Sequence, residues 1–140
     1  MIIYFDTSSL VKLYVEETHA ALVREWVEEA ELVASCCVAY PETISALDRR
    51  FNVGDFSKHD YELLIGAFSK DWLNFVVLDF DEIESGRLVR KYGLRGFDAV
   101  HLSSAKMIKR DASVALFFSS FDEKLNKAAI AEGLEVLIPD

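Results

Sequence analysis

Apolar residues first appear as an unbroken run at residues 2–5. A run without apolar–polar alternation is typical of a strand that is buried on both faces, as in the centre of a parallel sheet. Comparable runs occupy residues 32–35, 75–78 and 114–118, and a shorter one occupies residues 136–138. We therefore predict five strands. We expect residues 2–5 to be central and residues 75–78 to be buried as well.

Between these runs, apolar residues recur at the three- and four-residue spacing of a helix face. A short helix is predicted after Asp6, and longer helices at residues 18–31, 40–51, 57–74, 81–92, 98–110 and 122–132. Strands that alternate with helices in this way predict an α/β fold around a central, mainly parallel sheet of about five strands. We interpret residues 1–140 as a single domain.

Composition restricts the class of protein. Hydrophobic residues make up 51% of the chain, and only 6 Gly and 2 Pro occur, which argues against disorder and against a turn-rich sandwich. No apolar run approaches the about 20 residues of a membrane span, and no secretory signal is recognisable, so we expect no membrane partner and a cytoplasmic location. In that reducing compartment, the adjacent Cys36 and Cys37 are expected to be buried thiols.

The net charge is −9, from 15 basic and 24 acidic residues. This balance argues against a broad electrostatic nucleic-acid binder. It leaves open an enzyme that binds a phosphodiester through bound cations, because a cluster of acids that awaits Mg²⁺ adds negative charge to the count.

Four acidic residues from distant segments are predicted to meet at one edge of the sheet. Asp6 directly follows the first strand, and Asp122 follows the fourth. Glu42 and Asp98 open helices, and a helix that leaves or feeds a parallel strand begins at the carboxyl edge, where ligands bind. Each acid alone has an ordinary interpretation as a helix cap or as a first-turn acid. Their convergence favours a common site.

Clustered carboxylates repel each other unless a cation or a proton is supplied. Hard oxygen ligands suit Mg²⁺ or Mn²⁺, and such an ion can polarise a phosphoryl oxygen and lower the pKa of a bound water. No Ser-His-Asp or Cys-His set competes with this interpretation. The candidate catalytic residues and metal ligands are therefore Asp6, Glu42, Asp98 and Asp122.

Residues 2–8, Glu42, residues 94–102 and residues 118–125 resemble the motifs of PIN-domain proteins. The resemblance extends over the whole chain and is greatest to the VapC-type toxin ribonucleases of prokaryotic toxin–antitoxin pairs. It implies a single three-layer α/β/α domain and a Mg²⁺- or Mn²⁺-dependent endoribonuclease that cleaves RNA. It also implies inhibition by a small antitoxin protein and, often, a homodimer. The acidic quartet of the family corresponds to Asp6, Glu42, Asp98 and Asp122.

The chain departs from the family pattern near its last acid. Ser120 stands where Thr is usual, and Glu123 intervenes before Lys124 where basic residues often follow. Arg49 and Arg50 end the helix that Glu42 opens, where cations suit the helix dipole, so we interpret them as structural or surface residues.

Several polar residues near the quartet have two interpretations. Thr7, Ser8 and Ser120 are candidates to orient ligands or water behind the carboxylates, or to cap helices. His101 could be a general base, but we favour a role in packing or hydrogen bonding behind the site, since hydrolysis by metal-bound water does not require it. Arg95 could contact a phosphate or the loop backbone.

Three other functions are weighed against a VapC-type toxin. A receiver-like phosphorylatable signalling domain is also a parallel α/β fold, and Asp79 and Asp81 follow the third predicted strand. That class needs an acid pair after the first strand, where this chain has only Asp6 followed by Thr7. A non-toxin PIN ribonuclease in RNA processing is the second alternative. An inactive PIN fold kept for partner binding is the third, and the intact quartet argues against it.

Overall fold

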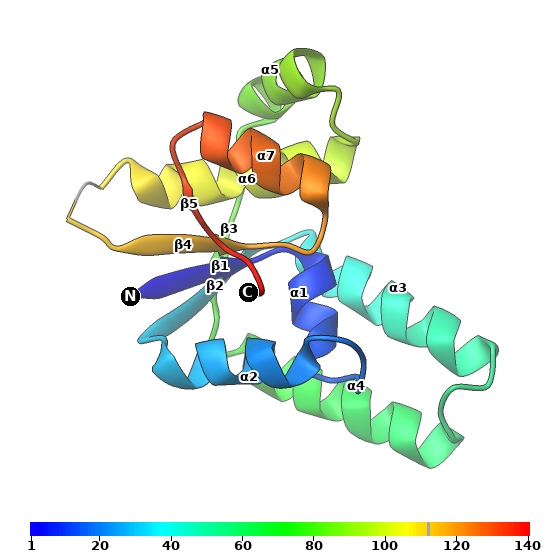
Figure 1. Ribbon diagram of the computed structural model, residues 1–140. Coiled ribbons are helices and arrows are strands. Elements are labelled where there is room, and N and C mark those ends of the chain that lie inside the picture. Colours follow the sequence, from blue (N-terminus) through cyan, green and yellow to red (C-terminus); the bar gives the residue numbers. More distant parts are fainter. Residues whose placement is uncertain (112) are drawn as a thin grey trace.

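The computed structural model describes residues 1–111 and 113–140 as an α/β fold (Figure 1). In this part of the chain, two helices separate successive strands, except that α7 alone connects the last two. The elements are β1 (Ile2–Phe5), α1 (Thr7–Lys12), α2 (Ala20–Glu29), β2 (Leu32–Cys36), α3 (Ala39–Asn52), α4 (Lys58–Trp72), β3 (Val76–Leu78), α5 (Glu82–Tyr92), α6 (Gly96–Lys109), β4 (Leu116–Ser119), α7 (Glu123–Ala131) and β5 (Glu135–Leu137).

The five strands form one sheet in the order β3-β2-β1-β4-β5, and every neighbouring pair is parallel. β1 is central: Ile2 is in register with Leu32 of β2 and with Leu116 of β4. The prediction of a parallel sheet around residues 2–5 is confirmed. Because all strands run the same way, their carboxyl ends lie at a single edge of the sheet.

Helices cover both faces of the sheet, which gives the three layers that Figure 1 shows. Tyr4 and Phe118 are fully buried against the layer of α5, α6 and α7. Ile3 and Phe5 point to the opposite face, where they pack with Leu10 of α1 and with residues of α2. This alternation along β1 explains why its apolar run is unbroken: both faces of the strand are core.

The structure differs from the sequence-based predictions in several details, of which four affect the interpretation. β3 is an edge strand with a neighbour on one side only, so Val77 is 40% exposed instead of buried. α6 begins at Gly96, two residues before the predicted start, and Arg95 in an extended conformation precedes it. β4 begins at Leu116 and runs on to Ser119. Cys36 is buried, but Cys37 lies just beyond the end of β2 and is exposed.

No helix in the described residues is both long enough and apolar enough to cross a membrane.

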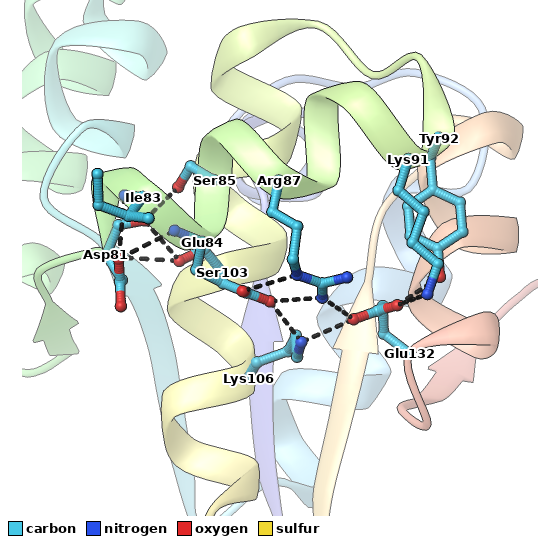
Figure 2. A network of polar contacts seen from close by, with 10 residues as sticks. All are labelled: Asp81, Ile83, Glu84, Ser85, Arg87, Lys91, Tyr92, Ser103, Lys106 and Glu132. Carbon is cyan, nitrogen blue, oxygen red and sulfur yellow. Dashed lines mark hydrogen bonds and ion pairs between the residues drawn. The ribbon is translucent and has the colours of Figure 1, made fainter.

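Glu132, which directly follows α7, joins the three helices on one face of the sheet. Its side chain is 7% exposed and accepts hydrogen bonds from Arg87 and Lys91 of α5 and from Lys106 of α6 (Figure 2). The donor–acceptor distances are 2.7 Å for Arg87, 3.1 Å for Lys91 and 2.7 Å for Lys106. Glu84 of α5 also accepts hydrogen bonds from Arg87 and Lys106, so the acids and cations form one connected network.

The pKa of Glu132 lies well below its usual value. Burial alone would raise this pKa, but hydrogen bonds from four neighbouring side chains, Lys106 first among them, stabilise the ionised form and outweigh burial. Hydrogen bonds from Arg87 and Lys106 lower the pKa of Glu84 to about 2. A carboxylate whose pKa is lowered in the folded state stabilises the fold above its unfolded pKa. That stabilisation is lost as the pH falls through the folded pKa.

We expect Glu132→Gln to lower the free energy of unfolding at pH 7 by roughly 2 kcal/mol, because the amide keeps the size of the side chain but loses its charge-assisted hydrogen bonds. For a chain of this length, that corresponds to about 6–8 °C in melting temperature. The difference from the wild type should shrink as the pH falls below the unfolded pKa of glutamate, about 4.3. Thermal melting at neutral and acidic pH measures both effects.

Glu123→Gln is the matched control, because Glu123 lies at the other end of α7 and pairs with Lys127 at 3.1 Å while both side chains remain exposed to solvent. An exposed ion pair contributes little to stability, so this variant should melt like the wild type. Equal losses in the two variants would contradict the role of the network at Glu132.

Candidate active site

Asp6 lies at the carboxyl end of the central strand β1 and is 3% exposed. Its Oδ1 accepts hydrogen bonds from the Ser8 hydroxyl at 2.6 Å and from the Ser9 backbone N–H at 3.1 Å, so Asp6 caps α1. Ser8 in turn accepts a hydrogen bond from the Phe121 backbone N–H at 3.0 Å, which ties the end of β1 to the loop after β4. Asp6 can therefore both cap α1 and belong to a site at the end of β1.

Glu42 lies in the first turn of α3, and its Oε1 is held by two side chains. The Thr7 hydroxyl donates to Oε1 at 2.8 Å, and the His101 Nε2 lies 2.9 Å from the same oxygen. On the other side of the His101 ring, Nδ1 lies 2.7 Å from the Tyr4 hydroxyl. Tyr4, His101 and Glu42 thus form a hydrogen-bonded chain that leads from the core to the edge of the sheet.

The direction of these hydrogen bonds follows from the buried tyrosine at one end of the chain. Burial raises the pKa of the Tyr4 hydroxyl well above 10, so the tyrosine keeps its proton and can donate it to Nδ1 of His101. With Nδ1 as the acceptor, Nε2 is the ring nitrogen that donates to Glu42. Burial alone would raise the pKa of Glu42, but the hydrogen bonds from His101 and Thr7 outweigh it and lower that pKa below the usual value. His101 and Thr7 therefore both favour the ionised form of Glu42.

Asp98 and Asp122 approach the same edge from α6 and α7. Asp98 is half-buried in the first turn of α6, and Asp122 caps α7 by accepting a hydrogen bond from the Leu125 backbone N–H at 2.8 Å. Burial raises the pKa of Asp98, and the negative charges of Asp122 and Asp6 raise it further. These three carboxylates therefore lie close enough to disfavour the ionisation of Asp98.

Burial also raises the pKa of Asp6, while the nearby His101 and the hydroxyls of Ser120 and Ser8 partly oppose this shift. The Ser120 hydroxyl accepts a hydrogen bond from the Asp122 backbone N–H at 3.0 Å. Ser120 thus stands between the first and last acids of the quartet. Ser8, Ser120 and Thr7 are all found behind the carboxylates, where the sequence suggested that they could orient them.

The four carboxylates of the quartet lie at one edge of the sheet, but they do not converge on a single point. Within residues 1–111 and 113–140, no three His, Cys, Asp or Glu side chains lie close enough together to hold one ion. Local hydrogen bonds fix an oxygen of Asp6, of Glu42 and of Asp122. To bind one ion together, the acids must rotate toward each other, and the mutual repulsion of ionised carboxylates opposes this until a cation is supplied.

The donor set nevertheless fits a hard divalent cation, because it consists of carboxylate oxygens whose ionisation is mutually unfavourable. A family model described as "PIN domain" matches residues 3–131. The chain belongs to the PIN-domain family. Within it, the chain is 31% identical to Ribonuclease VapC49 of Mycobacterium tuberculosis, over 96% of this chain and 94% of that protein.

Two solved structures share the PIN fold of this chain. A toxin–antitoxin complex from Klebsiella pneumoniae matches with a TM-score of 0.65 and 18% identity, over 99% of this chain and 98% of that chain. The Mycobacterium tuberculosis toxin VapC20, described as cleaving the sarcin–ricin loop, matches with a TM-score of 0.65 and 16% identity, over 98% of this chain and 99% of that chain. At these identities, the structures show the fold alone.

The PIN assignment decides against a receiver-like signalling domain. The strand order β3-β2-β1-β4-β5 also differs from the 2-1-3-4-5 order of receiver-like folds. Asp79 and Asp81, which motivated that alternative, have local roles. Asp81 caps α5, and Asp79 accepts a hydrogen bond from the next backbone N–H.

The sequence-based interpretation of His101 is confirmed: it is 2% exposed and forms hydrogen bonds behind the quartet. The sequence analysis did not predict the hydrogen bond between Tyr4 and His101. A tyrosine in an otherwise apolar buried strand was the available signal, because a buried hydroxyl requires a hydrogen-bond partner. Its partner could not be identified, since His101 is 97 residues away in the sequence.

Proposed function

We propose that this PIN protein is a metal-dependent endoribonuclease and the toxin of a VapBC-type toxin–antitoxin pair. The observation that carries the proposal is the meeting of Asp98, Asp122 and Asp6 at the carboxyl edge of the sheet, where their charges raise the pKa of Asp98. Similarity to a VapC ribonuclease over nearly the full length of both chains supports the choice of RNA as the substrate.

Divalent-metal dependence is general among PIN ribonucleases, and Mg²⁺ or Mn²⁺ suits the oxygen ligands of this chain. The residues that would hold the ion are Asp6, Glu42, Asp98 and Asp122. When bound, such an ion lowers the pKa of a coordinated water and polarises a phosphoryl oxygen. The hydrogen bonds to Glu42 keep it ionised, which favours a role as a ligand over one as a proton acceptor.

The side chains behind the quartet orient it. Thr7 and His101 fix Oε1 of Glu42, and Ser8 fixes Oδ1 of Asp6. Both ring nitrogens of His101 are engaged in hydrogen bonds, so we assign His101 as a positioning residue and not as the general base. These hydrogen bonds hold one oxygen each of Asp6 and Glu42 and leave their other carboxylate oxygens available to a cation.

The proposed partners are RNA as substrate and a small antitoxin protein as inhibitor, in the cytoplasm, with a homodimer as the assembly. The similar structure from Klebsiella pneumoniae is a toxin–antitoxin complex, and VapBC2 of Rickettsia felis was crystallised with a DNA fragment from its promoter. These observations concern those proteins, and they support an antitoxin as the partner to test for this chain.

Expression of this chain alone should arrest bacterial growth and produce new RNA ends, and co-expression of a small protein encoded beside it should relieve both effects. Growth curves together with mapping of 5′ ends in total RNA measure the outcome. New ends without growth arrest would indicate a PIN ribonuclease of RNA processing. Unchanged growth and unchanged RNA would contradict the proposed function.

A further inference from the structure

Phe97 is a large apolar side chain in an unexpected place. It is the second residue of α6, next to Asp98, and it is 58% exposed. It lies outside the three clusters of buried hydrophobic residues that form the core. An exposed aromatic ring beside a proposed catalytic acid gains little from the fold and is available to a ligand.

Phe97 lines two pockets, and Glu42 also lines both. The first pocket, of about 750 Å³, lies between α5 and the start of α6, and Phe80, Val89 and Val100 form part of its wall. The second, of about 450 Å³, lies beside α3 and includes Val38. Both volumes fall within the about 300–1,000 Å³ of pockets that hold small molecules. Whatever occupies both pockets must therefore pass over Phe97 and Glu42.

Each pocket carries one arginine. Arg95, which precedes α6, lies in the first pocket, and Arg49 of α3 lies in the second. Both side chains are exposed; Arg49 donates a hydrogen bond to Ser45 on its own helix. A guanidinium recognises phosphate with paired hydrogen bonds. Arg49 is a surface residue, as the sequence suggested, and it also lines a pocket that contains Glu42.

We propose that Phe97 is a base-stacking wedge for single-stranded RNA. The bases on either side of the scissile phosphate occupy the two pockets and stack against Phe97, while Arg95 and Arg49 contact the neighbouring phosphates. This inference rests on the proposed ribonuclease function and makes an unpaired RNA segment the substrate. Because only unpaired bases can stack on Phe97, this residue would help to determine where RNA is cut.

Two features favour RNA over a protein segment as the occupant. The pockets adjoin at Glu42, so their occupant lies at the proposed cleavage point. Acids also line these pockets, Glu42 in both and Glu82 and Asp98 in the first. Arg95 and Arg49 offset these acids, and each can pair with a phosphate on one side of that point, in a chain whose net charge of −9 otherwise repels RNA. Proteins hold single-stranded nucleic acid by combining cations that contact the backbone with aromatic side chains on which bases stack.

The test uses Asp6→Asn as a background that binds RNA without cutting it, and a short single-stranded RNA with 2-aminopurine as the fluorescent base. Stacking on Phe97 should quench the fluorescence. Adding Phe97→Ala should abolish the quenching and weaken binding about ten- to a hundredfold, the scale of one base stacked on an aromatic ring. Phe97→Tyr should restore both. Leu73→Ala, which removes another exposed apolar side chain at the end of α4, should change neither.

Salt dependence tests the arginines separately. If Arg49 contacts one phosphate, Arg49→Gln should make the slope of log Kd against log salt concentration shallower by about 0.7.

Tight binding that Phe97→Ala leaves unchanged would overturn the inference even if the wild type cleaves RNA. A variant that binds RNA normally but no longer responds to the antitoxin would overturn it too, and would assign the pockets to that partner. Quenched binding without cleavage by the wild type would instead overturn the proposed function alone.

Discussion

Replacing Asp6 with Asn should reduce RNA cleavage by at least about a hundredfold while the protein stays folded. Asp6 is the acid at the end of the central strand, and the substitution removes its charge without changing its size. Loss of a single preorganised electrostatic contact typically costs a hundred- to a thousandfold in rate. The rate of cleavage of a single-stranded RNA, with Mn²⁺ present, measures the effect.

The fold should tolerate this change for two reasons. Asn is as good a helix cap as Asp, so the hydrogen bond from the Ser9 backbone N–H to residue 6 can be kept. Burial raises the pKa of Asp6, which means that the fold disfavours its charge, and an amide carries none. Asp60→Asn is the matched control, because Asp60 is an exposed acid in the first turn of α4. Cleavage by Asp6→Asn at the wild-type rate would remove Asp6 from the site.

The sequence was sufficient to predict the succession of strands and helices along the chain and the edge of the sheet to which its acids belong. The unbroken apolar run at residues 2–5 correctly indicated a strand buried on both faces, whereas the similar run at residues 75–78 forms the edge strand β3. Once the strands are parallel, the position of an acid relative to its strand or helix determines the edge at which it lies. Asp6, Glu42 and Asp98 could therefore be placed together without any knowledge of side-chain geometry.

What could not be predicted depends on packing between distant segments. The exposure of Val77 follows from the edge position of β3, which the order of elements along the chain does not reveal. The contact of Tyr4 with His101 depends on how α6 lies across β1. Likewise, Phe97 lines two pockets only because the start of α6 lies near both α5 and α3.

Asp98→Asn should raise the melting temperature of the metal-free protein and reduce its stabilisation by metal. Burial and the charges of Asp122 and Asp6 raise the pKa of Asp98. A carboxylate with a raised folded pKa favours folding at low pH, and its contribution is lost as the pH rises through the folded value. At pH 7.5, the folded wild type therefore carries an unfavourable charge that Asn removes.

A divalent ion that binds the ionised quartet of the folded protein, but not the unfolded chain, should offset the destabilisation caused by the charge of Asp98. At a hundredfold excess over its Kd, such an ion adds about 2.7 kcal/mol to the free energy of unfolding, which is several degrees in melting temperature for a chain of this length. Thermal melting at pH 7.5, first with EDTA and then with increasing Mn²⁺, should show a large shift for the wild type and for the exposed-acid control Asp60→Asn, and a small one for Asp98→Asn. If Asp98→Asn shifts as much as the wild type, or the wild type does not shift, then Asp98 is not a ligand of a metal site.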